Sequence, residues 1–228
     1  MRLHRGGSGA CGTGVFAARL QAENPTATLV AIDSSARMVE LARGRGVDAR
    51  VADATALPFD DACCDVVAAM WMLYHVPDLD GALAQVRRVL RPGGLFVAVT
   101  NGEKHLASLL REAGGEPLST QFSTQNGRAA LETRFDDVGQ VDLTTQAVFP
   151  DFAGAQAYLA TGPADALPRS LASDGSPEPR RSSAAADRWL CGALPDRVGW
   201  FVTPLPRDLA LWMKQISSPR RWRATPVN

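Results

Sequence analysis

A glycine-rich stretch at the start of the chain has the residue types that let a backbone hold a ligand. It runs from Gly9 to Gly14, GACGTG, and directly precedes a predicted helix. Glycines allow close approach of a ligand, and free N–H groups at a helix start can donate to its polar atoms. The Gly12-x-Gly14-x-x-Ala17 spacing also fits dinucleotide-binding loops, although a turn that binds nothing produces the same pattern.

Two aspartates follow the loop at the ends of predicted strands. Asp33 comes nineteen residues after Gly14, where a carboxylate can accept hydrogen bonds from both ribose hydroxyls of an adenosine. Nicotinamide and adenosylmethionine cofactors both contain that ribose, so Asp33 does not separate them. Asp53 follows the next strand, where it can accept from the adenine amino group. The structural alternatives are a helix-start acid at Asp33 and a turn aspartate at Asp53.

His75 is the candidate for proton transfer. It follows the strand predicted over 65–70, at the edge where open α/β sheets bind ligands. A base is needed only where the group to be modified carries a proton, and His75 could instead fix the loop that continues into Val76 and Pro77. His105 is a second candidate. The histidines lack the spacing of metal-binding motifs, so no metal is expected.

These residues require a sheet wrapped by helices to bring them together. From residue 13 to residue 100, short apolar runs alternate with helix-period segments, which is typical of a parallel sheet covered by helices. Ser35 is the expected N-cap of a helix through Arg43, whose apolar face would hold Met38, Val39, Leu41 and Ala42. The predicted helices cover 15–20, 35–43 and 79–90, and the predicted strands cover 26–32, 47–51, 65–70 and 95–100.

Beyond residue 102 the pattern is weaker. Helices are predicted over 103–112, 127–135 and 152–160, and strands over 138–149 and 198–203. The Pro- and Ser-rich stretch 162–185 is typical of a linker. We therefore predict a domain over 1–162, with a ligand half at about 8–102 and a cap region at about 103–162. Residues 163–228 are predicted to form a partly disordered extension rich in proline, arginine and tryptophan.

Composition narrows the classes of function. The 24 basic and 24 acidic side chains cancel, but residues 1–162 carry 14 basic and 18 acidic groups and residues 163–228 carry 10 and 6. An acidic ligand-binding part argues against nucleic acid as a partner. No apolar run reaches the ~18 residues of a membrane span. Four cysteines without CxxC spacing favour a reducing compartment, so we expect a cytoplasmic protein.

Two segments carry a resemblance to a known family. They are DATALPFDDACCDVV over 53–67 and MLYHVPDLDGALAQVRRVLRPGGLFVAVTNG over 72–102. Together with the glycine loop they resemble the class I S-adenosylmethionine-dependent methyltransferases of the methyltransferase type 11 group. The resemblance implies a Rossmann-like, doubly wound α/β sheet, S-adenosylmethionine as cofactor and transfer of its methyl group to a small-molecule acceptor. It is continuous over about 10–102, weaker to about residue 162, and absent beyond.

The resemblance also implies roles for individual residues. Asp33 and Ser34 would bind the ribose, Met38 would pack near the adenine, and Asp53 with Ala54 would hold the adenine amine. Met70 would lie by the methionine moiety and the reacting methyl group. The loop residues that would line the methionine and ribose part are Ala10, Cys11, Gly12, Thr13 and Gly14.

The chain departs from this family at its start. The usual apolar first strand precedes the glycine loop, but residues 1–7 read MRLHRGG, Ser8 stands at an acidic position and Ala10 replaces a glycine. We therefore expect a sheet without a normal first strand, whose neighbours would keep unpaired edges. One interpretation is a start upstream of Met1. Another is an impaired methyltransferase-like binding protein, and a NAD-dependent oxidoreductase is a third alternative that rests on the loop and Asp33 alone.

Overall fold

The structure is a computed structural model of the 228-residue chain. It describes residues 5–9, 11–103, 105, 120–145, 148–149, 189–190 and 196–204. The helix predicted over 152–160, the linker predicted over 162–185 and nearly all of the helix predicted over 103–112 lie outside the described residues.

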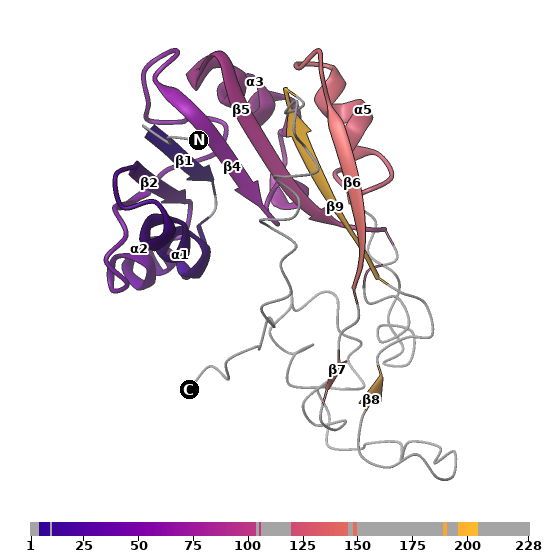
Figure 1. The fold of residues 1–228 in the computed structure, drawn as a ribbon, viewed down its shortest axis with the longest axis horizontal. Helices are drawn as coiled ribbons and strands as arrows, with labels where there is room; N and C mark the ends of the chain where they lie inside the picture. The colour runs from indigo at the N-terminus through magenta and orange to yellow at the C-terminus, as the bar shows by residue number, and fades with distance from the viewer. Residues whose placement is uncertain are drawn as a thin grey trace.

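The described strands form a seven-stranded sheet in the order β3-β2-β1-β4-β5-β9-β6 (Figure 1). Neighbouring strands from β3 to β5 pair in parallel, whereas β9 is antiparallel to both β5 and β6. Two short strands, β7 (Val148–Phe149) and β8 (Trp189–Leu190), pair separately. The strands of the main sheet are β1 (Arg5–Gly9), β2 (Thr28–Asp33), β3 (Ala49–Val51), β4 (Cys64–Met70), β5 (Leu90–Asn101), β6 (Gly139–Thr145) and β9 (Asp196–Thr203).

Helices cover both faces of this sheet, as the sequence predicted. The described helices are α1 (Val15–Glu23), α2 (Ala36–Arg43), the short 3₁₀ helix η1 (Leu73–His75), α3 (Leu79–Val89) and α5 (Gly127–Glu132). Side chains of a strand alternate between faces, so Ala31 packs with α1 and α2 while Ile32 packs in the core that includes α3. The Ser35 cap is confirmed, because its Oγ accepts from the Met38 N–H. Leu41 was wrongly assigned to the buried face of α2, since it is exposed.

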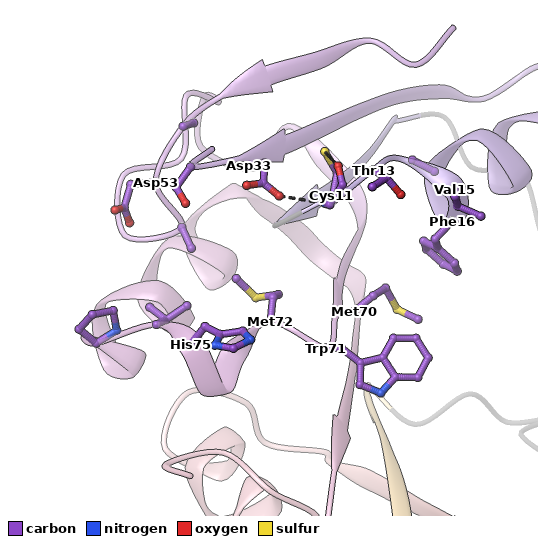
Figure 2. A pocket seen from close by; sticks show the side chains of 17 residues that line it. Cys11, Thr13, Val15, Phe16, Asp33, Asp53, Met70, Trp71, Met72 and His75 are labelled. Atoms are coloured by element: carbon purple, nitrogen blue, oxygen red, sulfur yellow. Dashed lines mark hydrogen bonds between the residues drawn. The ribbon is translucent and has the colours of Figure 1, made fainter. Parts of the chain in front are cut away.

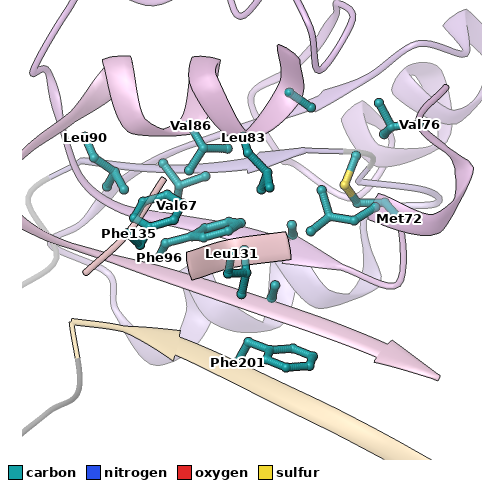
Figure 3. Packing of buried hydrophobic residues seen from close by; sticks show 14 of the residues in the cluster. Val67, Met72, Val76, Leu83, Val86, Leu90, Phe96, Leu131, Phe135 and Phe201 are labelled. Atoms are coloured by element: carbon teal, nitrogen blue, oxygen red, sulfur yellow. The ribbon is translucent and has the colours of Figure 1, made fainter. Parts of the chain in front are cut away.

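The larger core lies between the sheet and α3 with α5 (Figure 3). Val86 and Leu83 of α3 face Phe96 of β5, and Phe96 stacks on Phe135 with ring centroids 5.4 Å apart. Phe201 of β9 is fully buried in the same core. Burial of these aromatic rings fixes α3 and α5 to the sheet, and with them the loops that surround its carboxyl edge.

The expectation that the sheet lacks its first strand was wrong. Arg5–Gly9 forms β1, which pairs in parallel with β2 on one side and β4 on the other. Strand pairing uses backbone N–H and C=O groups, and Gly6, Gly7 and Ser8 supply these as any residue does. Apolar composition was therefore a poor guide to a strand whose place is determined by its two neighbours.

The strand predicted over 198–203 is present and belongs to the main sheet. It is part of β9, which lies between β5 and β6 and pairs with them over Asp196–Thr203. Residues from the predicted extension thus complete the seven-stranded sheet. The division of the chain at residue 162 falls outside the described residues and stays a prediction.

Candidate functional site

A cavity of about 590 Å³ lies at the carboxyl ends of the parallel strands. Asp33 ends β2 and Met70 ends β4, while Cys11 follows β1 and Asp53 follows β3. The strand order reverses between β1 and β4, and doubly wound sheets bind ligands in the crevice that forms at such a reversal. The volume of the cavity lies within the range of small-molecule sites.

The glycine loop enters α1 through two left-handed residues. Gly12 has φ +51° and Gly14 has φ +78°, which side chains disfavour. A Cβ on Gly14 would lie 2.6 Å from the Cβ of Ala42, so this glycine also allows α1 to approach α2. A Cβ on Gly12 would meet no atom within 4 Å. Gly12 is therefore the glycine that leaves room beside the cavity, and Gly14 is the one required for packing.

Asp33 connects the loop to the next helix. Its Oδ2 accepts a hydrogen bond of 2.9 Å from the Gly12 N–H, and its Oδ1 accepts one of 2.9 Å from the Ser35 N–H (Figure 2). Asp33 is only 7% exposed and lines the cavity. Each carboxylate oxygen can accept a second hydrogen bond. Asp33 can therefore hold the loop and still accept from two hydroxyl groups of a ligand.

Asp53 lies in a turn on the same side of the cavity (Figure 2). Its Oδ1 accepts from the Thr55 N–H at 2.8 Å and from the Thr55 Oγ1 at 2.7 Å. These two hydrogen bonds lower the pKa of the Asp53 carboxyl. They leave Oδ2 without a hydrogen-bond partner among the described residues. Arg88 of α3 secures the loop that follows, donating to the carbonyl oxygens of Leu57 and Phe59.

The opposite side of the cavity is apolar. Phe16, Met70 and Trp71 face it there, together with the exposed Val15 (Figure 2). Trp71 has φ +52°, a left-handed backbone that is a genuine outlier for a bulky residue. Its indole Nε1 donates to the Asn101 Oδ1 at 3.1 Å.

His75 lies on the wall below Asp53, near Met72 (Figure 2). It ends η1, its backbone N–H donates to the Met72 carbonyl at 2.9 Å, and its ring centroid is 4.3 Å from that of Tyr74. His75 is exposed to solvent. His105 lies in the turn after β5 and is not among the residues that line the cavity.

The structure brings most of the predicted site residues to this cavity. They are Cys11, Gly12, Thr13, Asp33, Ser34, Asp53, Ala54, Met70 and His75. Gly14 packs against Ala42 instead, Met38 does not line the cavity, and Ala10 lies outside the described residues.

Burial is the main cause that raises the pKa of the Cys11 thiol, and the nearby Asp33 carboxylate is the second. The raised pKa favours the neutral form of the thiol.

Other lining residues were not identified from the sequence. They are Val15, Phe16, Ala17, Ala52, Trp71, Met72, Val76 and Pro77. Their positions beside Gly14, Asp53, Met70 and His75 were the available signal, because a cavity at a sheet edge is lined by several consecutive residues of each loop.

No group of three possible metal ligands occurs among the described residues. None of the described helices has both the length and the apolar character to cross a membrane.

Comparison with known proteins finds similar sequences for the first part of the chain. Residues 8–98 match a family described as "Methyltransferase domain". The chain is 39% identical over 94 residues to the ubiquinone/menaquinone biosynthesis C-methyltransferase UbiE of Desulfotalea psychrophila, covering 40% of this chain and 38% of that protein. It is 39% identical over 119 residues to the 27-O-demethylrifamycin SV methyltransferase of Amycolatopsis mediterranei, covering 46% and 43%. These matches span less than half the length of the two relatives.

Solved structures share the fold over most of the chain. The YcgJ protein of Bacillus subtilis is similar with a TM-score of 0.60 at 18% identity, covering 88% of this chain and 92% of that one. A putative methyltransferase of Bacillus halodurans is similar with a TM-score of 0.58 at 15% identity, covering 90% and 94%. At these identities the likeness shows the fold, and it confirms the predicted Rossmann-like, doubly wound sheet.

Proposed function

Because residues 8–98 belong to the methyltransferase domain family, we propose that this chain transfers a methyl group from S-adenosylmethionine to a small-molecule acceptor. One observation carries the proposal: the glycine loop, Asp33 and Asp53 border the same cavity, with an apolar wall opposite. An adenosine needs acceptors for its ribose hydroxyls and its adenine amine, and a methyl transfer needs a site that excludes water.

The described residues fit this cofactor. Asp33 keeps accepting capacity on both oxygens beside the loop, and one oxygen of Asp53 has no hydrogen-bond partner in the part of the chain that the structure describes. When bound, S-adenosylmethionine would supply an electrophilic methyl group, which would pass from its sulfur to the acceptor and leave a thioether. Asp33 would bind the ribose, Asp53 would bind the adenine amine, and Met70 would lie by the methionine moiety.

His75 is proposed as the base for acceptors that lose a proton. It lines the cavity from η1, and its exposed imidazole can pass that proton to water. The relatives named above act on quinone precursors and a rifamycin precursor by their names, which supports a small organic acceptor. The neutral, apolar wall of Phe16, Met70 and Trp71 supports it as well.

The competing functions have less support. The impaired-enzyme hypothesis rested on a missing first strand, and β1 is present. The oxidoreductase hypothesis rested on the glycine loop and Asp33, which a methyltransferase also needs. The similar proteins named above include methyltransferases and no oxidoreductase.

Isothermal titration of S-adenosylmethionine into the protein tests the cofactor. We expect binding by the wild type and at least tenfold weaker binding by Asp33→Asn, because a hydrogen bond to a charged group contributes about 1.5–3 kcal/mol. Asp48→Asn is the matched control, since Asp48 is an exposed carboxylate paired with Arg50 outside the cavity. Radiolabelled methyl transfer to extracted small molecules then tests the reaction. A wild type that binds no S-adenosylmethionine would refute the proposal.

A further inference from the structure

The apolar end of the cavity contains a tryptophan, Trp71, to which the proposed cofactor site assigns no role. Trp71 is 38% exposed, whereas the neighbouring Met70 is 9% exposed. Phe16 lies on the other side of Met70, so the two aromatic rings flank the methionine side chain (Figure 2). The described residues that line this end carry no charge, whereas Asp33 and Asp53 lie farther along the cavity, away from Trp71 (Figure 2).

The position of this indole is energetically unfavourable in two respects, its backbone conformation and its exposure to water. Trp71 keeps a left-handed backbone, its N–H donates to the Val99 carbonyl at 2.9 Å, and its Nε1 donates to the Asn101 Oδ1 at 3.1 Å. A strained backbone persists only where its surroundings enforce it, and such residues gather at ligand sites. Exposing a large apolar ring to water also forgoes burial energy. Both costs are accounted for if a ligand covers the ring.

We propose that Trp71, with Phe16 and Met70, forms the platform on which a planar, uncharged acceptor stacks. A ring held by its edge through Nε1 can present a face, and aromatic faces bind other planar rings in offset or edge-to-face arrangements. Among the residues that the structure describes, none of those lining this end is charged, which favours an uncharged acceptor over an ionic one. This inference rests on the proposed function, because it assigns the acceptor side of the same cavity.

The test compares a planar probe with a saturated one of the same carbon framework. We would titrate 2-naphthol and decahydro-2-naphthol into the protein saturated with S-adenosylhomocysteine, using wild type, Trp71→Phe and Trp71→Gly. Glycine suits φ +52°, so Trp71→Gly removes the ring while relieving backbone strain. Trp71→Phe keeps an aromatic face and loses the bond to Asn101. Leu41→Ala, which removes an exposed apolar side chain outside the cavity, is the control.

We expect the wild type and Leu41→Ala to bind 2-naphthol about three- to tenfold more tightly than its saturated analogue. Trp71→Phe should keep part of this preference and Trp71→Gly should lose it, with unchanged binding of S-adenosylmethionine. Equal affinity for both probes in the wild type, or a preference that survives in Trp71→Gly, would overturn the inference and leave the proposed function intact.

Two further results have separate meanings. Weaker binding of S-adenosylmethionine, but not of S-adenosylhomocysteine, by Trp71→Gly would place the indole against the sulfonium and overturn the acceptor assignment. A wild type that binds neither cofactor form would remove the proposed function itself, and the inference with it.

Discussion

Three glycines with left-handed backbones allow the packing and ligand roles of the glycine loop to be separated. Gly12, Gly14 and Gly46 have φ of +51°, +78° and +80°. Alanine at each should cost about 1–2 kcal/mol, because a left-handed backbone disfavours a Cβ. At Gly46 nothing lies within 4 Å of the new Cβ, and this residue is not part of the cavity. Gly46→Ala is thus the control for backbone strain alone.

Gly14→Ala should be the most destabilised of the three variants. Its Cβ would lie 2.6 Å from the Cβ of Ala42 and 2.7 Å from the Ala42 Cα, so α1 and α2 must separate. Overpacking of this kind costs about 1–3 kcal/mol. Added to the backbone term, the loss is about 2–5 kcal/mol, a large share of the ~5–15 kcal/mol stability of a typical domain.

Gly12→Ala should lose cofactor binding with little loss of stability beyond the backbone strain. Its Cβ would meet no atom within 4 Å, so its stability should match that of Gly46→Ala, while the added methyl group occupies space beside the cavity. Urea unfolding measures the stabilities, and titration with S-adenosylmethionine measures binding. Unfolding free energies for Gly14→Ala and Gly46→Ala that agree within 0.5 kcal/mol, about the spread of ordinary surface substitutions, would refute the packing argument. Undiminished cofactor binding by Gly12→Ala would refute the ligand role of the loop.

Two other substitutions test the turn at Asp53 and the last strand. The Thr55 bonds lower the pKa of Asp53, so they stabilise the fold above the ordinary carboxyl pKa and this contribution is lost as pH falls through the lowered value. Thr55→Val removes the Oγ1 bond and keeps the larger contribution of the backbone N–H, so the pKa of Asp53, measured by carboxyl-carbon NMR titration, should rise only part of the way to its ordinary value. An unchanged pKa would contradict the bond from the Thr55 hydroxyl. Phe201 is fully buried beside Phe122, so Phe201→Ala should cost about 3–5 kcal/mol in urea unfolding. A loss below 1 kcal/mol would mean that β9 contributes little to the core.

The sequence predicted the elements that follow a strong period. α3 was identified because its buried residues Ala82, Leu83, Val86 and Val89 recur at helical spacing. The β1 strand was missed because RGGSG carries no apolar pattern, and its pairing depends on backbone groups of β2 and β4 that lie far away in sequence. A local sequence pattern cannot predict a strand that forms because of pairing with strands distant in the sequence.

Some residues of the candidate site could be predicted from the sequence and others could not. Asp33 and Asp53 were identified because an acid at the end of a strand is a local signal, and both line the cavity. Trp71 was not identified as part of it, although it follows Met70 directly. Its place depends on a left-handed backbone and on the Asn101 amide thirty residues away, neither of which is visible in the sequence around it.

Asp33 links the fold to the proposed chemistry most directly. In the structure its two oxygens accept from the N–H groups of Gly12 and Ser35, so the carboxylate joins the loop after β1 to the start of α2. A bond to an ionised acceptor is stronger than one between neutral groups, so this link preorganises the loop before a ligand arrives. An asparagine would turn a donor toward one of these two N–H groups and leave one of them unpaired. Asp33→Asn should therefore loosen the loop and weaken cofactor binding together. Asp53 accepts from Thr55 in its own turn, so it can lose its charge with little effect on the glycine loop.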